Sequence, residues 1–231
     1  MLDVASWTTR LAGPARQVAG IAGPVVFTGA WIVSSLRQTG YPAAEIQLSG
    51  LAAPDARDPW IMVAGFVVLG GCTVAFGAAL HDALSGRSGV GQGRCRGGAG
   101  AAPQLIQGAG LLTIAAGLLR RDRMLLTPGS VSWHNHAHDV ISLVIYADLV
   151  AAQVLLAERF AREAGGLDPD WRSWRPWLLA SGVATAAVLI AFAADTSAPG
   201  AGILQRAAVT IPLAAITAIA GRLLRIPTRV G

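Results

Sequence analysis

The stretch WIMVAGFVVLGGCTVAFGAAL, residues 60–80, decides the fold class of this chain. It carries no charge and is long enough to cross a hydrocarbon core of about 30 Å, which takes roughly 20 helical residues. Five further apolar stretches of similar or slightly shorter length occur, at residues 18–36, 103–119, 138–157, 177–194 and 202–221. With 53% hydrophobic residues, 13% charged residues and a mean hydropathy of +0.52, the composition is not that of a soluble domain.

These stretches are too long and too evenly apolar for the strands of a transmembrane barrel, which alternate polar and apolar residues. Helices satisfy every backbone amide within the segment, as the bilayer interior requires. We therefore predict an all-α fold, a single bundle of six transmembrane helices over residues 1–231, located in the cell membrane. The segment between the first two helices, residues 37–59, should fold back as a cap, and residues 81–102 should form a flexible cytoplasmic loop.

The orientation follows from arginine, because the chain contains no lysine. With a cytoplasmic N-terminus, twelve of the 18 basic residues lie on the cytoplasmic side, which favours an N-in, C-in topology. The high pI of about 10.5 then reflects topology and contact with anionic headgroups of the lipid bilayer. A nucleic-acid partner would need a soluble basic domain, which the sequence lacks. Neither a nucleotide-binding fingerprint nor a disulfide is predicted, and no pattern indicates an oligomeric state.

Polar residues concentrate on the side opposite to the termini. The sequence His-Asn-His-Ala-His-Asp at residues 134–139 precedes an apolar stretch that itself contains Asp148. At about 100° per residue, His134 and His138 share one helix face, and Asp148 returns close to it. Ionisable groups in a membrane are expensive and usually have a partner or a function. We expect a polar shaft here, with Asp122, Asp195 and Arg206 nearby.

Several short motifs resemble a known family. They are Gly23-Pro24, Gly40-Tyr41, Leu48-Ser49-Gly50-Leu51, Trp60 with Gly65-Phe66 and Gly70, Gly117-Leu118 leading to Asp122, the histidine cluster, and Gly202-Ile203-Leu204-Gln205-Arg206. In their order and spacing they resemble the bacterial and archaeal membrane family known as domain of unknown function 998. The resemblance implies a six-helix membrane protein and brings no established activity with it.

One hypothesis for the polar cluster is a metal-dependent hydrolase or transferase acting on a lipid or lipid-like substrate. His134 and His138 with a carboxylate, Asp139 in the first place or else Asp122 or Asp195, would be zinc ligands, since catalytic zinc needs three such ligands and an open water position. Ser49 or Tyr41 could position the substrate. The candidate catalytic residues are Asp122, Asp148 and Arg206.

Two alternatives use the same residues differently. In a proton-coupled transporter or channel, Asp148 and the histidines would titrate along a pathway for a small molecule or ion. In a purely structural membrane protein, Arg206 would pair with Asp122 or Asp195, and the histidines would lie in a hydrated cap that keeps the helices in register.

Overall fold

The computed structural model describes residues 4–85, 100–124, 131–162, 169–194, 196 and 199–225, and all regular structure in these ranges is helical. This confirms the all-α fold class. The elements are α1 (Val4–Arg37), η1 (Leu48–Ala52), α2 (Pro59–Leu84), α3 (Ala102–Leu118), α4 (Trp133–Arg162), η2 (Pro169–Ser173), α5 (Trp174–Ala194) and α6 (Ala201–Arg225), where η marks a 3-10 helix.

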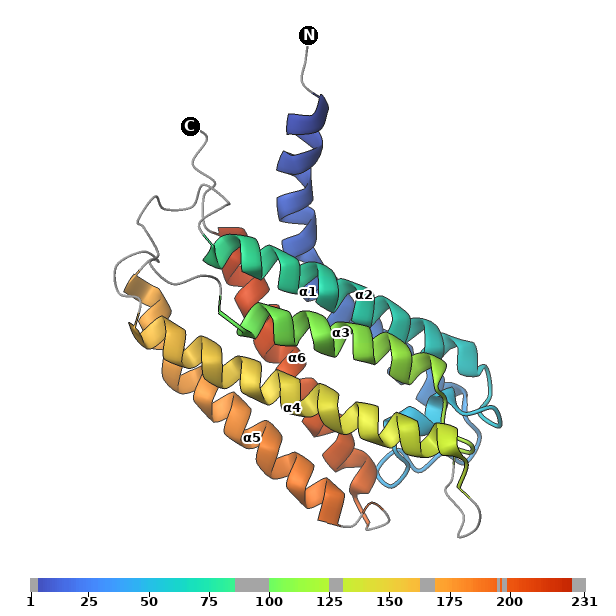
Figure 1. Cartoon of the computed structure of the whole chain (residues 1–231). Helices are drawn as coiled ribbons and strands as arrows, with labels where there is room; N and C mark the ends of the chain where they lie inside the picture. The colour runs from blue at the N-terminus through green and yellow to red at the C-terminus, as the bar shows by residue number, and fades with distance from the viewer. Residues whose placement is uncertain are drawn as a thin grey trace.

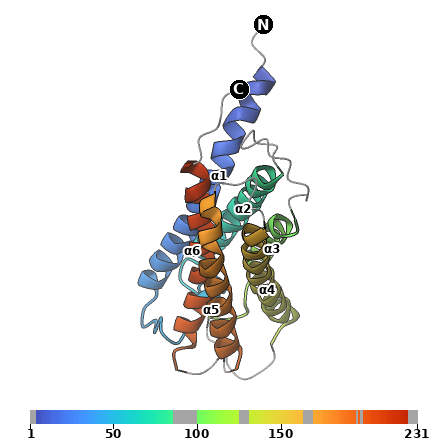
Figure 2. The same ribbon diagram turned by 90° about the vertical axis from the view of Figure 1, so that its left-hand side faces the viewer.

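The α-helices form a closed ring. Each one packs against the next along the chain, and α6 packs against α1. Because neighbours run in opposite directions, the start of α1 and the end of α6 lie at the same end of the bundle (Figure 1). Seen from the side, α6 lies between α1 and α5 (Figure 2). The ring therefore brings helices that are distant in the sequence, such as α1 and α6, into contact around a shared interior.

Five of the helices are long and apolar enough to cross a membrane: α1 from Pro14 onward, α2, α4, α6, and the segment that ends with α5. The helix α3 is apolar but has only 17 residues, about 25 Å at 1.5 Å per residue. A helical membrane bundle is thus shown by length and composition, while the six crossings and their orientation stay predictions.

Two glycines bring α2 and α3 close together. A Cβ atom added at Gly70 would lie 2.5 Å from the carbonyl oxygen of Gly110, and one added at Gly110 would lie 2.7 Å from the carbonyl oxygen of Gly70. Neither helix could approach the other so closely with a side chain at these positions. Small residues allow this backbone contact in membranes, where packing rather than hydrophobic burial holds helices together.

Residues 38–58, which we call the cap segment, cover the end of the bundle where α1 ends and α2 begins; we call this the cap end. All five residues of η1 in this segment are buried, and so are its flanking residues Ile46 and Ala53. A loop buried to this degree is part of the packed core. The segment therefore closes the cap end of the ring.

The helices α4 and α5 diverge toward the cap end. Both views show them close together at the opposite end and apart near the cap (Figures 1 and 2). The buried residues of α5 are Leu178, Ser181, Gly182 and Thr185, all in the half away from the cap. The cap-side half of α5, residues 186–194, has no buried residue and leaves that side of the ring loosely packed.

Candidate functional site

Arg206, in the first turns of α6, holds the cap segment in place. Its Nη1 donates hydrogen bonds to the carbonyl oxygens of Ala43 (2.6 Å), Ile46 (3.0 Å) and Gly202 (2.9 Å). Its Nη2 donates to the Tyr41 hydroxyl at 2.6 Å. Burial raises the pKa of Tyr41, so the phenol stays neutral and its oxygen can accept this bond. One planar guanidinium thus fixes the path of the cap segment over α6.

The residues beside Arg206 continue this contact. The Leu48 amide donates a hydrogen bond to the Gln205 side-chain oxygen, and Gln205 Nε2 lies 3.5 Å from the Ser49 hydroxyl. Gly202 allows the approach, because a Cβ atom there would lie 2.5 Å from the Ile46 carbonyl oxygen. Contacts from Gly202, Gln205 and Arg206, within little more than one turn of the helix, therefore join the cap segment to α6.

A second polar cluster lies where α3 ends and α4 begins. Asp122 accepts hydrogen bonds from the Ser132 hydroxyl and, at 2.7 Å, from the Ser132 amide. The buried Asn135 side-chain oxygen lies 3.4 Å from the Asp122 amide and from Arg121 Nε, and its Nδ2 donates to Asp139 at 3.0 Å. Arg121 and Asp139 form an ion pair at 3.6 Å. We call these five residues the α3–α4 cluster.

Hydrogen bonds, burial and neighbouring charges shift the pKa values of the Asp122 and Arg121 side chains in the α3–α4 cluster. The side-chain and backbone hydrogen bonds from Ser132 hold the pKa of Asp122 below its usual value. Burial lowers the pKa of Arg121, while the nearby Asp139 and Asp122 carboxylates oppose this. Ser132 also caps α4, since its hydroxyl accepts from the Asn135 amide at 3.4 Å. This cluster joins the end of α3 to the start of α4. Its two carboxylates and its arginine are engaged in hydrogen bonds and an ion pair within the cluster.

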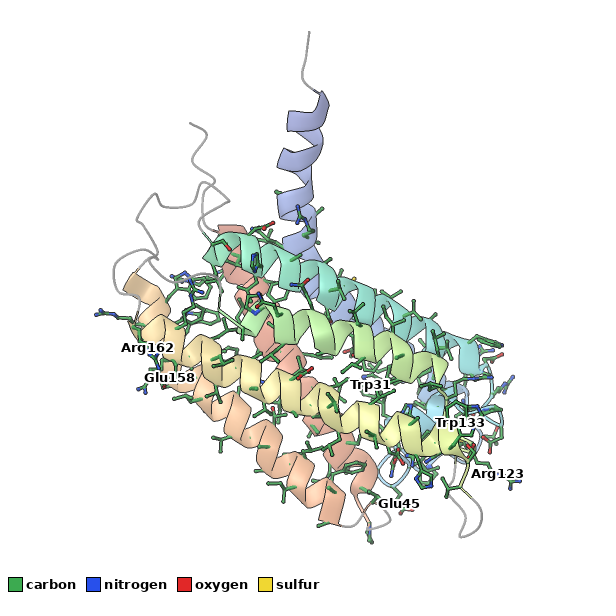
Figure 3. The ribbon with its side chains drawn as sticks, viewed as in Figure 1. Trp31, Glu45, Arg123, Trp133, Glu158 and Arg162 are labelled. Atoms are coloured by element: carbon green, nitrogen blue, oxygen red, sulfur yellow. The ribbon has the colours of Figure 1, made fainter. Side chains whose placement is uncertain are left out.

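The two histidines that share a predicted face have different surroundings. His138 is buried, with Nδ1 2.9 Å from the carbonyl oxygens of both Ala116 and Leu119 at the end of α3. Its ring also meets the Phe66 ring edge-on. His134 stacks on Trp133 at a centroid distance of 3.8 Å, at the cap end where Figure 3 labels Trp133. His138 thus caps the last carbonyls of α3.

A cavity of about 70 Å³ lies inside the ring, one helical turn below His138. We call it the central cavity. The helices α2, α3, α4 and α6 contribute to its wall, which contains aliphatic, aromatic and hydroxyl side chains and no charged residue. The lining residues are Phe66, Leu69, Thr73, Ala109, Thr113, Ala116, Ser142, Ile145, Tyr146, Leu149, Val209, Leu213 and Ile216.

The four hydroxyl groups of this wall differ in their hydrogen bonding. Thr73 donates to the Leu69 carbonyl oxygen at 2.8 Å, and Thr113 donates to the carbonyl oxygen four residues before it at 2.7 Å. Ser142 and Tyr146, one turn apart on α4, have no hydrogen-bond partner among the described residues. Tyr146 is only 8% exposed. The wall of the central cavity therefore offers two hydroxyls that the described chain leaves unused.

Asp148 does not continue the line of polar residues from His138. Its carboxylate faces α3, where a Cβ atom added at Gly108 would lie 3.5 Å from Asp148 Oδ2, and it does not line the central cavity. The residues that continue from His138 into the bundle are Ser142 and Tyr146 instead. In place of the expected shaft, the line from His138 leads to the hydroxyl groups of Ser142 and Tyr146 in a mainly apolar wall. Asp148 lies outside this wall.

The comparison with known families assigns the chain to one family. Residues 21–222 match the family described as a protein of unknown function, DUF998. The chain belongs to the DUF998 family. No curated protein and no solved structure matches the chain. The match confirms the resemblance drawn from the sequence motifs, and it extends from the second half of α1 to near the end of α6.

Three of the motifs that resemble DUF998 meet in space at the cap end. The Gly40-Tyr41 pair, the Leu48-Ser49-Gly50-Leu51 run and the Gly202-to-Arg206 run lie far apart in the sequence, yet they contact one another through Arg206 and Gln205. Gly50 adds a further contact, because a Cβ atom there would lie 2.7 Å from the Met124 carbonyl oxygen. In this DUF998 protein the motifs thus build the closed cap.

The predicted metal ligands are not brought together. The described residues contain no group of three His, Cys, Asp or Glu side chains that could share a metal ion. His134 stacks on Trp133, His138 Nδ1 faces backbone carbonyls, and Asp139 binds Asn135 and Arg121. The expected zinc site of His134, His138 and Asp139 therefore gains no support from their placement. Asp195, the other proposed carboxylate, lies outside the described residues.

The predicted polar residues of the cap end belong to two different networks. Arg206 belongs to the cap anchor, whereas Asp122 belongs to the α3–α4 cluster. Sequence reasoning selected Arg206, Asp122 and His138, and it missed Ser142, Tyr146 and Gln205. A signal for Ser142 and Tyr146 does exist, because they follow His138 at four-residue intervals and share its side of α4.

Proposed function

We propose that this DUF998 protein binds a mainly apolar, chain-bearing molecule within the bilayer, with the central cavity as its binding site. The observation that supports this proposal is the cavity itself, which is partly open, bordered by residues of four helices and lined by apolar side chains with a few hydroxyls. Small-molecule sites have this character, in which apolar walls supply affinity and a few polar groups orient the ligand. The class of ligand is lipid-like, since a lipid environment surrounds the site.

The size of the cavity limits what can enter it. At about 70 Å³ it has roughly half the volume of an engineered cavity of about 150 Å³ that binds benzene. A whole lipid is far larger, so only a segment of a few carbon atoms fits inside. The rest of such a ligand would have to remain in the surrounding bilayer.

The packing of α5 suggests the route of entry. The cap segment covers the cap end of the ring, and α5 contributes no residue to the cavity wall. The cap-side half of α5 has no buried residue and diverges from α4 (Figures 1 and 2). We therefore place the entrance on the side of the bundle, between the cap-side halves of α4 and α5, so that a lipid chain enters without crossing water.

Filling the cavity tests this proposal. Val209 is partly buried and lines the cavity on α6, so Val209→Phe would occupy the space that the ligand needs. The wild-type protein and the variant would be placed in nanodiscs with an alkyl-diazirine probe, photolysed and mapped by mass spectrometry. We expect labelling of residues 142–149 in the wild type and loss of most of it in Val209→Phe.

The matched control is Val183→Phe on α5, where the valine is 68% exposed and lies outside the cavity wall. This variant should keep wild-type labelling of residues 142–149. Val209→Ala enlarges the cavity and should keep or increase the labelling. This variant separates filling of the cavity from a general intolerance of substitution at position 209. Equal labelling of residues 142–149 in both phenylalanine variants would contradict the proposal.

A second candidate function, proton-coupled transport, is favoured by Asp148. This half-buried carboxylate lies near the middle of α4, against Gly108 of α3, with no ion pair among the described residues. An acid at that depth is a candidate for proton binding. Asp148→Asn should then abolish a pH-driven flux in liposomes without lowering the melting temperature. A variant that unfolds instead would assign Asp148 a structural role. A metal-dependent hydrolase has no comparable observation in its favour.

A further inference from the structure

We propose that the ligand of the central cavity carries a neutral hydrogen-bond acceptor, such as an ester or ketone carbonyl, and that the Tyr146 hydroxyl recognises it. This inference rests on the proposed function and adds the chemical class of the ligand. Two observations support it: the hydroxyl groups in the cavity wall, and the absence of charged side chains among the lining residues.

The first step is the unused hydrogen bond of Tyr146. A buried tyrosine hydroxyl normally finds a partner, because an unpaired donor in an apolar environment is unfavourable. Tyr146 is 8% exposed and lines the cavity, and no described residue accepts its hydrogen bond. Its hydroxyl oxygen is not among the fully buried atoms that lack a partner, so the hydroxyl is accessible to a second molecule. A ligand acceptor inside the cavity would satisfy it.

The second step is the contrast with the threonines of the same wall. Thr73 and Thr113 are satisfied by carbonyl oxygens of their own helices, four residues earlier. Short hydroxyl side chains can make such bonds within a helix, whereas the rigid ring of a tyrosine holds its hydroxyl far from its own backbone. Tyr146 therefore depends on a group from elsewhere in the cavity, and Ser142, one turn away, can assist it.

The third step concerns charge. None of the lining residues is charged, so a carboxylate or an ammonium group in the cavity would lack a counter-ion. Burying an isolated charge in an apolar site is far more costly than burying a neutral carbonyl that is hydrogen-bonded. The wall thus selects a neutral acceptor on an alkyl chain over a free fatty acid or an amine.

A competition experiment tests this inference. The alkyl-diazirine probe would be displaced from the nanodisc protein by a methyl ester or by an alkane of equal chain length, each expressed as its mole fraction in the bilayer. One neutral hydrogen bond predicts that the ester competes about threefold to tenfold better than the alkane in the wild type. Tyr146→Phe should remove this preference while the alkane competes unchanged.

The other tyrosine of the chain provides the matched control. Tyr41→Phe makes the same change in the cap segment, outside the cavity wall, and should keep the preference for the ester. A preference that survives in Tyr146→Phe would overturn the assignment to Tyr146, and Ser142→Ala would show whether the serine carries it. Equal competition by ester and alkane in the wild type would overturn the ligand class and leave the proposed function intact. Absence of probe labelling from residues 142–149 in the wild type would remove both proposals.

Discussion

Arg206 determines the conformation of a loop that has little regular structure of its own. Its guanidinium reaches three carbonyl oxygens and one hydroxyl at once, and it also lies 5.5 Å from the centroid of the Trp31 ring. A guanidinium presents several donors in one plane, so it can satisfy carbonyls that point inward from a turn. The arginine thus supplies hydrogen bonds that fix the backbone of the cap segment, as backbone pairing does within a strand or a helix.

Arg206→Lys should loosen the cap segment. An ammonium group keeps the charge but cannot reach all four acceptors, so we expect a loss of about 2–3 kcal/mol in the free energy of unfolding, equal to one or two hydrogen bonds to a charged group. Hydrogen–deuterium exchange should rise in residues 41–52. Arg225→Lys, an exposed arginine at the other end of α6, is the control. Unchanged exchange in the cap segment would contradict this role of Arg206.

At the residue scale, the sequence draws attention to residues that are chemically unusual, whereas their role stays a prediction. Arg206, Asp122 and His138 stand out because charged or titratable side chains are rare in this chain. Ser142 and Tyr146 do not stand out, since hydroxyl residues are common in membrane helices and usually bond to their own backbone. Only the structure shows that these two hydroxyls, unlike those of Thr73 and Thr113, have no hydrogen-bond partner among the described residues, and that they line the central cavity.

At the scale of elements, the contact between α6 and the cap segment depends on a missing side chain. A Cβ atom at Gly202 would meet carbonyl oxygens of Ile46, Ala43 and Ala44 at 2.5–2.9 Å. Backbone atoms cannot move aside as the end of a flexible side chain can, so the helix and the cap segment would have to separate. The glycine is therefore a packing requirement of this helix end.

Gly202→Ala should destabilise the protein by about 1–3 kcal/mol, the usual cost of overpacking a tight contact. Gly221→Ala in the same helix provides the control, because nothing lies within 4 Å of a Cβ atom there. That change should be neutral or stabilise by about 0.5–1 kcal/mol, as alanine favours helix over glycine. Thermal unfolding followed by tryptophan fluorescence would measure both, and equal melting temperatures for the two variants would refute this account of Gly202.

The apolar pattern located the helices but not their ends. The stretch at residues 60–80 lies within α2, Pro59–Leu84, whereas the stretch at residues 138–157 underestimates α4, which spans Trp133–Arg162. Hydropathy marks the part of a helix suited to hydrocarbon, and a helix continues beyond it where caps satisfy its ends. His134 and His136 consequently lie on the first turn of α4 rather than before it.

At the scale of the whole molecule, the bundle has two ends of different character. The cap end contains Glu45, Arg123 and Trp133, and the opposite end contains Glu158 and Arg162 (Figure 3). Among the described residues, arginines are more numerous toward the opposite end than toward the cap end, which favours a cytoplasmic location for the opposite end. Reporters fused to the two termini should both be active only as cytoplasmic fusions. A periplasmic signal from either terminus would overturn this orientation.

The closed ring could not be predicted from the sequence, although its helices could. Periodicity shows which residues are apolar on a helix, but in lipid both the buried and the lipid-facing sides are apolar. The central cavity arises from the packing of α2, α3, α4 and α6, three of them consecutive and one distant in sequence. Its position depends on small differences in side-chain volume that no single segment encodes.

The mutual contact of Gly70 and Gly110 has a mechanical consequence. Two backbones that touch cannot slide or tilt independently, so α2 and α3 behave as one stiff plate on their side of the ring. The cap-side half of α5 has no such restraint, since none of its residues is buried. Any change in the spacing of the helices is therefore expected on the α5 side of the ring rather than on the α2–α3 side.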